Sequence, residues 1–270
     1  MTISQAELTA GGLLLAIDGE VANVTLARPE RRNAMTPATW HGLAAIGAAL
    51  PPEVRVVVLR GQGPSFCAGI DLRLFSADGV PGEAPVFGEA DPEATIAGYQ
   101  AGYLWLRNPA IVSVAAVQGH AIGAGFQLAL ACDLRILADN ATLCMKEPAL
   151  GLVPDLTGTK PLVDIVGLPR AIELCLTART VTAAEALPLR HAERVVPAGE
   201  LDAAVAELVA ALLAIDAATA RVAKALLQQA GAHSLDEQAA AERKAQAALL
   251  RRGIGTVGIG TVRSALRYTP

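Results

Sequence analysis

The chain has 270 residues, enough for one large domain, or a domain with an appendage, around a substantial core. Its formal net charge of −4 argues against nucleic acid as the main partner. The mean hydropathy of +0.41 comes from Ala and Val, and charged residues interrupt the apolar stretches before they reach the ~18 residues of a membrane-spanning helix.

The first half of the chain predicts alternating strands and helices. Leu13–Ile17 and Val21–Ala27 flank an Asp18-Gly19 turn, the pattern of a β-hairpin. Thr36-Pro37 predicts the start of a helix that runs to about Leu50, because Thr caps helices and Pro suits their first position. The other expected elements are a strand at Val54–Arg60, a mobile surface loop at Ser76–Pro92, a helix at Thr95–Leu106 and a strand at Ile111–Val117.

The second half is expected to continue in the same way and then to become helical. The expected elements are a helix at 123–131, strands at Leu134–Ala138, Ala141–Met145 and Arg194–Val196, an irregular segment at Lys146–Thr159, helices at Lys160–Val166 and Pro169–Thr177, and a short helix at the capping box Thr182–Glu185. From Gly199 to about Arg252 the sequence is Ala/Leu-rich, with expected breaks near Asp216 and Gly231. We therefore expect an α/β core at 1–196 and a helical extension at 197–270 that packs on the core or on another subunit.

The start of the chain and its cysteines indicate the compartment. The first twenty residues have no basic start, so we expect no signal peptide. The four cysteines lie far apart, without metal-type spacing or disulfide density, and are expected to be reduced core thiols. We expect a cytoplasmic protein with neither a membrane nor a metal as partner.

Two glycine-rich turns follow strands, at 61–72 and 119–127. Their small residues, Ala68-Gly69 and Gly123-Ala124-Gly125, would let a carbonyl group approach the backbone closely. Two backbone N–H groups on one oxygen form an oxyanion hole, and a helix starting near Gly123 favours negative charge at its first turn. The alternative is that these glycines only allow strand and helix to pack closely.

Glu147 is the carboxylate best placed to serve such a site. It lies in an apolar stretch, and partial burial there would raise its pKa towards the range of a general base. The alternative is a salt bridge with Lys146 or an arginine. Other motifs fail: Gly61-Gln62-Gly63 lacks the third glycine of a dinucleotide fingerprint, and the scattered histidines form no ligand set, so His120 in the glycine turn is not expected to be catalytic.

Several separate segments, in the right order, resemble the crotonase superfamily, the enoyl-CoA hydratase/isomerase family, over nearly the whole chain. The matching segments are Arg28-Pro29-Glu30-Arg31-Arg32-Asn33-Ala34, Phe66-Cys67-Ala68-Gly69-Ile70-Asp71-Leu72, Gly119-His120-Ala121-Ile122-Gly123-Ala124-Gly125, Cys132-Asp133, and Glu147 four residues before Gly151. The resemblance implies an α/β crotonase-like spiral of ββα units with a C-terminal helical extension. It also implies an acyl-CoA substrate, no cofactor beyond the coenzyme A of that substrate, and a homotrimer or dimer of trimers.

By that resemblance, the N–H groups of Ala68 and Ala124 hold the thioester oxygen, and Ala124 stands where the family usually has glycine. The same turns would supply further substrate-binding residues: Cys67, Gly69, Ile70, Asp71 and Gly123. A basic loop would lie near the CoA phosphates, although a solvated loop is the competing interpretation. Its three arginines are Arg28, Arg31 and Arg32.

The catalytic acids differ from those of the family's hydratases, which use two glutamates. Glu147 falls on the second position, but Gln127 occupies the first, three residues beyond Ala124 on the same helix face. An amide can orient water but cannot take its proton, so hydration should be impaired. Family members with a single glutamate are typically isomerases, which move a proton between carbons through a dienolate.

Asp155 is a second candidate acid, eight residues after Glu147. The resemblance implies a proton-shuttling Glu/Asp pair of the type found in dienoyl-CoA isomerases. The alternative is that Asp155 caps the Thr157–Thr159 turn or the following helix. We therefore expect isomerase-type proton transfer on enoyl-CoA thioesters, with ordinary 2-enoyl-CoA hydration, non-catalytic acyl-CoA binding or a structural role in an oligomer as alternatives.

Overall fold

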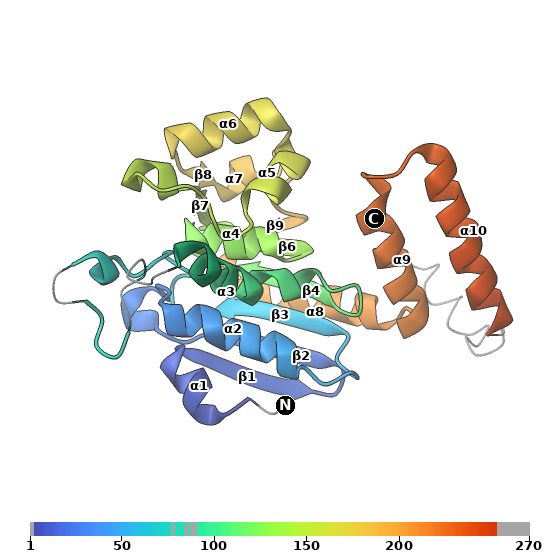
Figure 1. Ribbon diagram of the computed structural model, residues 1–270, viewed down its shortest axis with the longest axis horizontal. Helices are drawn as coiled ribbons and strands as arrows, with labels where there is room; N and C mark the ends of the chain where they lie inside the picture. Colours follow the sequence, from blue (N-terminus) through green and yellow to red (C-terminus); the bar gives the residue numbers. More distant parts are fainter. Residues whose placement is uncertain (1–2, 77–78, 84–85, 87–90, 253–270) are drawn as a thin grey trace.

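A six-stranded sheet forms the centre of the computed structural model, which describes residues 3–76, 79–83, 86 and 91–252 (Figure 1). The strand order is β1-β2-β3-β4-β6-β9, in which only β1 and β2 pair in antiparallel fashion. The parallel strands β3 and β4 are buried on both faces, as their Val- and Ala-rich sequences require. The strands are β1 (Leu13–Asp18), β2 (Val21–Leu26), β3 (Val56–Gly61), β4 (Val112–Val117), β6 (Leu134–Ala138) and β9 (Arg194–Val196).

A small second sheet follows the glycine turn at residue 119. It consists of β5 (His120–Ile122), β7 (Thr142–Cys144) and β8 (Val181–Thr182), in the order β5-β7-β8. Gly119 has φ +57°, and a Cβ there would lie 2.1 Å from the carbonyl oxygen of Pro64. The turn therefore needs glycine, and it brings β5 against the loop that follows β3.

Helices cover both faces of the large sheet (Figure 1). On one face, α2 (Pro37–Ala49) and α3 (Pro92–Leu104) pack over the core cluster that contains Val57 and Ala115. On the other face, α8 (Leu201–Leu213) packs against the alternate residues of the same strands, including Val56 and Val114. The fully buried α4 (Ala124–Ala131) follows β5. The fold class expected from the sequence, α/β, is confirmed.

The remaining α-helices precede β1 or follow β7 in the chain. They are α1 (Gln5–Ala10), α5 (Thr159–Val166), α6 (Leu168–Thr177), α7 (Ala183–Ala186), α9 (Ala217–Ala230) and α10 (Leu235–Arg251), with short 3-10 helices at Pro29–Arg31, Leu72–Phe75, Trp105–Arg107, Glu147–Leu150 and Ala198–Glu200. The α9–α10 hairpin projects from the body (Figure 1) and has no buried residue. Lys224 ties α9 to the core through a 2.6 Å bond to Asp133.

The predicted elements agree with these bounds, with a few differences. The sequence did not predict α1, which has a capping box between Ser4 and Glu7, or the short strands β5 and β8. Helix α3 starts at Pro92 instead of Thr95, because the Asp91 side chain caps it. Residues 77–78, 84–85 and 87–90 of the expected surface loop lie outside the described part of the chain, as does 253–270 of the extension. No single described helix could cross a membrane, although the bent pair Ala198–Leu213 and Ala217–Ala230 satisfies the length and composition criteria.

Candidate active site

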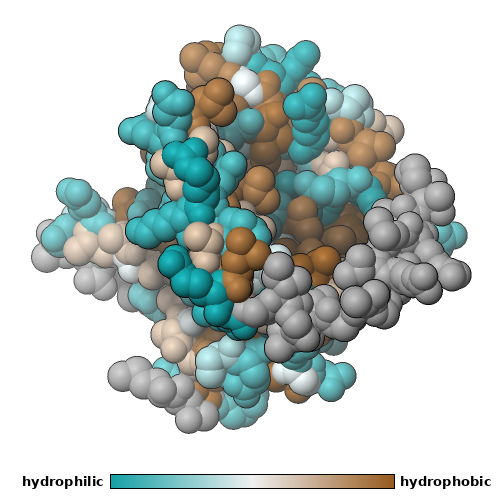
Figure 2. Space-filling model, turned by 90° about the vertical axis from the view of Figure 1, so that its right-hand side faces the viewer, coloured by the Kyte–Doolittle hydropathy of each residue, from teal (hydrophilic) through white to brown (hydrophobic). Residues whose placement is uncertain are grey.

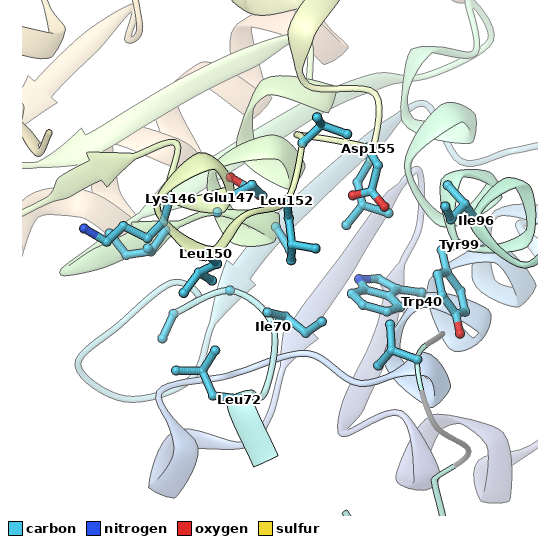
Figure 3. Close-up of a pocket in the computed structure, with 18 of the residues that line it drawn as sticks. Trp40, Ile70, Leu72, Ile96, Tyr99, Lys146, Glu147, Leu150, Leu152 and Asp155 are labelled. Carbon is cyan, nitrogen blue, oxygen red and sulfur yellow. The ribbon is translucent and has the colours of Figure 1, made fainter. Parts of the chain in front are cut away.

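A largely apolar cavity of about 530 Å³ opens where the two glycine-rich turns meet the segment after β7 (Figure 3). Its walls come from the start of α4, the 68–72 loop, the 146–156 segment and side chains of α2 and α3. The predicted site residues that line it are Ala68, Gly69, Ile70, Gly123, Ala124, Glu147 and Asp155. The fold therefore brings together motifs that are up to 87 positions apart in the sequence.

The two turns are joined by backbone hydrogen bonds. The Cys67 N–H donates to the His120 carbonyl at 2.7 Å, and the Ile122 N–H donates to the Cys67 carbonyl at 3.0 Å. Gly69 has φ +93°, and a Cβ there would lie 2.7 Å from the Ile122 oxygen. Glycine is required at this position because the loop passes directly over the end of β5.

One of the two turns presents a different N–H donor from the one expected. The Ala68 N–H already donates to the Arg32 carbonyl at 2.9 Å, so the prediction of Ala68 as an oxyanion donor is wrong. Gly69 and Asp71 both bond to Met35, through the Gly69 carbonyl and the Asp71 N–H. In extended backbone, the N–H of the residue between them points the other way. That residue is Ile70, which lines the cavity.

Two N–H groups at the cavity are thus left for a ligand. Within the described ranges, no hydrogen bond uses the N–H of Ile70 or of Ala124. Ala124 is the first residue of α4, where helix geometry provides no internal acceptor for the N–H. Its neighbour Gly123 has φ +52°, and a Cβ there would lie 3.1 Å from Glu147 Oε1. The glycine lets the start of the helix and the carboxylate share one side of the cavity.

Glu147 is a buried acid with one oxygen held and one free. Its side chain accepts a hydrogen bond from Gln127 Nε2 at 2.7 Å through Oε1. The other oxygen, Oε2, is buried and has no partner among the described residues. Burial raises the pKa of Glu147, and the Gln127 hydrogen bond only partly opposes this. The alternative of a salt bridge with Lys146 or an arginine is wrong, since no ion pair of the described residues includes Glu147.

Gln127 has both ends of its amide occupied. In addition to the bond to Glu147, its Oε1 accepts the backbone N–H groups of Leu156 at 2.9 Å and Gly158 at 3.1 Å. The side chain is fully buried and is not part of the cavity wall. Gln127 therefore positions Glu147 and the 156–158 segment, and it does not reach the cavity, where a water molecule would have to be oriented.

Asp155 is the second carboxylate of the cavity (Figure 3). Burial raises its pKa, and its charge contributes to the raised pKa of Glu147. The helix-capping alternative is wrong: the N-cap of α5 is Gly158, and the helix has no side-chain cap. Asp155 is anchored through its backbone, whose carbonyl accepts a 2.6 Å bond from Gln100 Nε2.

Residues 16–253 match the model of a known family, enoyl-CoA hydratase/isomerase. The chain belongs to this family. A carnitinyl-CoA dehydratase of Proteus mirabilis is 37% identical over 201 residues, 73% of this chain and 72% of that protein. A Mycobacterium bovis protein named "Probable enoyl-CoA hydratase" is 33% identical over 196 residues, 72% of each chain.

A solved structure shows the same fold. The Thermobifida fusca YX protein crystallised in complex with acetoacetyl-CoA is 62% identical, with a TM-score of 0.91 over 93% of this chain and 100% of that one. The family and crotonase-like fold expected from the sequence are confirmed. The chain is therefore an enzyme of the enoyl-CoA hydratase/isomerase family that acts on acyl-CoA.

Three of the residues predicted to bind substrate or CoA serve the scaffold of this family member instead of the cavity. Arg28 pairs with Asp71 at 3.1 Å, and Arg73 pairs with the same carboxylate at 2.6 Å. The hydrogen bond from Arg73 is the largest of the effects that lower the pKa of Asp71 to about 2. The thiol of Cys67 is buried and donates to the Asn33 carbonyl at 3.1 Å. None of Arg28, Cys67 and Asp71 lines the cavity, because these contacts hold the basic loop against the glycine turn.

Sequence analysis missed several supporting residues. Asn33, at φ 56°, accepts the Arg28 N–H and donates to the carbonyls of two residues in the first glycine turn. Trp40 and Tyr99 form an aromatic wall of the cavity, with ring centroids 4.5 Å apart. Because only 3% of the residues are aromatic, each aromatic residue in the sequence was a candidate for a structural or binding role.

Proposed function

We propose that this family member favours double-bond isomerisation of enoyl-CoA thioesters over their hydration. The observation that carries the proposal is the direct 2.7 Å bond between Gln127 Nε2 and Glu147 Oε1. Hydration needs a water molecule that two glutamate carboxylates hold and deprotonate, as the family resemblance implies. In this chain, the Gln127 amide contacts Glu147 directly, where a hydratase would hold the water molecule. The amide oxygen accepts hydrogen bonds from backbone N–H groups. A single base beside an oxyanion hole suffices for moving a proton.

The N–H groups of Ile70 and Ala124 form the proposed oxyanion hole. A thioester oxygen placed between them would receive two hydrogen bonds, which strengthen as negative charge develops on the enolate. The start of α4 adds its partial positive charge at Ala124. Both donors are fixed by the scaffold before substrate binds, so little reorganisation is needed during the reaction.

Glu147 carries the proton in this mechanism. Its carboxylate removes a proton from the α carbon of a 3-enoyl thioester, which leaves a dienolate held by the two N–H groups. Glu147 then delivers this proton to the γ carbon, so the double bond moves to the 2 position and no water is consumed. Burial raises the basicity of the carboxylate, which helps it remove a carbon-bound proton. With a dienoyl substrate, Asp155 would be the second group of the proton-shuttling pair and would act at a carbon further along the acyl group.

The coenzyme A part of the substrate would be held by exposed cations at the cavity entrance. Because Arg28 is committed to Asp71, the better candidates are Arg31 and Arg32, which are exposed. Lys146 lines the cavity, and its ammonium points away from the aromatic end (Figure 3). These groups would supply the local positive charge that an acidic protein needs for phosphates.

Self-association into a homotrimer or a dimer of trimers is the proposed quaternary state. Large leucines of the projecting hairpin are exposed, with Leu227 at 77% and Leu235 at 85%. Figure 2 shows hydrophobic residues gathered in a hollow on the face viewed from the hairpin side. Exposed apolar surface of this kind favours an interface with a second copy, and light scattering after gel filtration tests it.

The proposed function is tested with 3-enoyl-, 2-enoyl- and dienoyl-CoA thioesters. We expect turnover of the 3-enoyl substrate to exceed hydration of the 2-enoyl substrate. Glu147→Gln should abolish turnover and leave CoA affinity nearly unchanged. Asp155→Asn should reduce dienoyl turnover more than 3-enoyl turnover. Faster hydration than isomerisation would establish an ordinary hydratase, and tight binding of all three without turnover would establish an acyl-CoA-binding protein.

A further inference from the structure

We propose that Trp40 is a rigid end wall that limits the length of the acyl group, and that Tyr103 holds this wall at a fixed distance from the thioester site. The substrates would then be short, apolar, uncharged acyl thioesters. The inference rests on the proposed function in one respect: it places the thioester oxygen at the N–H of Ala124.

The wall lies at the end of the cavity away from Glu147. Figure 3 shows Trp40 and Tyr99 side by side at one end, with Ile70 and Leu152 between them and Glu147. Trp40 is 2% exposed and Tyr99 is 5% exposed, so both rings are part of the core as well as the cavity surface. An acyl chain that extends from the oxyanion hole past Ile70 would meet these rings.

Several contacts prevent Trp40 from swinging aside. Its Nε1–H donates to the Tyr103 hydroxyl at 3.1 Å and also contacts Met35 Sδ at 3.3 Å. The ring of Tyr99 packs against it at a centroid distance of 4.5 Å. On the backbone side, a Cβ at Gly102 would lie 2.6 Å from the Trp40 carbonyl oxygen, so α3 is packed directly on α2. Opening this end would cost a buried hydrogen bond and aromatic packing.

The same contacts link the wall to the reacting end of the substrate. Tyr103 is fully buried, and its hydroxyl donates to the Ala124 carbonyl at 3.3 Å. Two hydrogen bonds in series therefore connect the indole of Trp40 to the residue whose N–H faces the thioester site. The distance between the oxyanion donor and the end wall is set by these bonds. Tyr103 is thus a positioning residue and Trp40 a specificity-determining one.

Binding of saturated acyl-CoA thioesters tests the wall without requiring turnover. We expect the unmodified enzyme to bind butyryl-CoA and to discriminate against decanoyl- and palmitoyl-CoA in calorimetry. Trp40→Ala should tighten decanoyl-CoA binding about tenfold, the effect of burying about two more CH₂ groups, with little change for butyryl-CoA. Trp40→Leu, which retains more of the core volume, should give a smaller shift in the same direction.

Trp105→Leu is the matched control, because Trp105 packs against α2 at Gly47 but does not line the cavity. It should leave the chain-length preference unchanged. Equal discrimination in the unmodified enzyme, Trp40→Ala and Trp40→Leu would overturn the proposal, as would the same shift in Trp105→Leu. Loss of isomerisation with a preserved length shift would refute the proposed function alone.

Discussion

The substitution Gln127→Glu places a second carboxylate directly against Glu147. In the structure, Gln127 Nε2 lies 2.7 Å from Glu147 Oε1. The other end of the side chain is held by the N–H groups of Leu156 and Gly158. A glutamate at this position would keep those two bonds and could not easily turn away. Its second oxygen would then face Glu147 Oε1.

The size of the effect follows from the separation of the charges. Two unit charges about 4 Å apart repel by about 4 kcal/mol at an effective dielectric constant of about 20. That repulsion corresponds to a shift of about three pKa units. The pair would therefore keep one proton near neutral pH. The N–H groups of Leu156 and Gly158 stabilise the ionised form of the new carboxylate, so Glu147 holds that proton. The proton would be lost only at a pH well above the range in which Glu147 ionises beside an amide.

The pH dependence of kcat with a 3-hexenoyl-CoA substrate measures this shift. A base acts in its deprotonated form, so activity is present above its pKa and is lost as the pH falls through it. We expect the acid limb of the profile to move upwards in Gln127→Glu, by up to about three units. Gln127→Met is the uncharged control, and it should leave the limb much closer to that of the unmodified enzyme. Its folded state must be checked, because two buried N–H groups lose their acceptor.

A coincident acid limb in the unmodified enzyme and in Gln127→Glu would refute this reasoning, since it would place the two side chains apart. A gain of hydration in Gln127→Glu without any movement of the limb would do the same. It would show that a water molecule separates the two acids and that the direct contact is not what limits hydration.

Two further predictions follow from single groups. Ala124→Pro removes the N–H of a proposed oxyanion donor at the first position of α4, where helices tolerate proline. We expect kcat for isomerisation to fall by about 10²–10³-fold while CoA affinity measured by calorimetry stays unchanged. A normal kcat would show that the Ala124 N–H is not part of the oxyanion hole. Burial lowers the pKa of His191 from 6.5 to about 4. The unfolded chain therefore binds this proton first, and the unfolding free energy should fall by up to about 3 kcal/mol between pH 6.5 and 4, a loss that urea titrations should not find in His191→Phe.

Local patterns were enough to predict most of the fold and part of the site. The β-branched run at 111–117, the Thr36-Pro37 helix start and the two glycine turns each depend on neighbours in the sequence. Glu147 was predicted from its apolar surroundings, and its burial is as expected. The difference at Gln127 was also visible in the sequence, because the family motif places this residue by its spacing from the glycine turn.

Only the tertiary structure decided which of these groups are free to act. The sequence motif does not distinguish the N–H of Ala68 from that of Ile70. In the structure, the carbonyl of Arg32, 36 positions before Ala68, accepts the Ala68 N–H, whereas no hydrogen bond of the described residues uses the Ile70 N–H. The same holds for Arg28, whose guanidinium pairs with Asp71, and for Trp40, whose indole bonds to the Tyr103 hydroxyl. A residue type determines which bonds a group can make, whereas the availability of that group depends on partners that folding brings from distant parts of the chain.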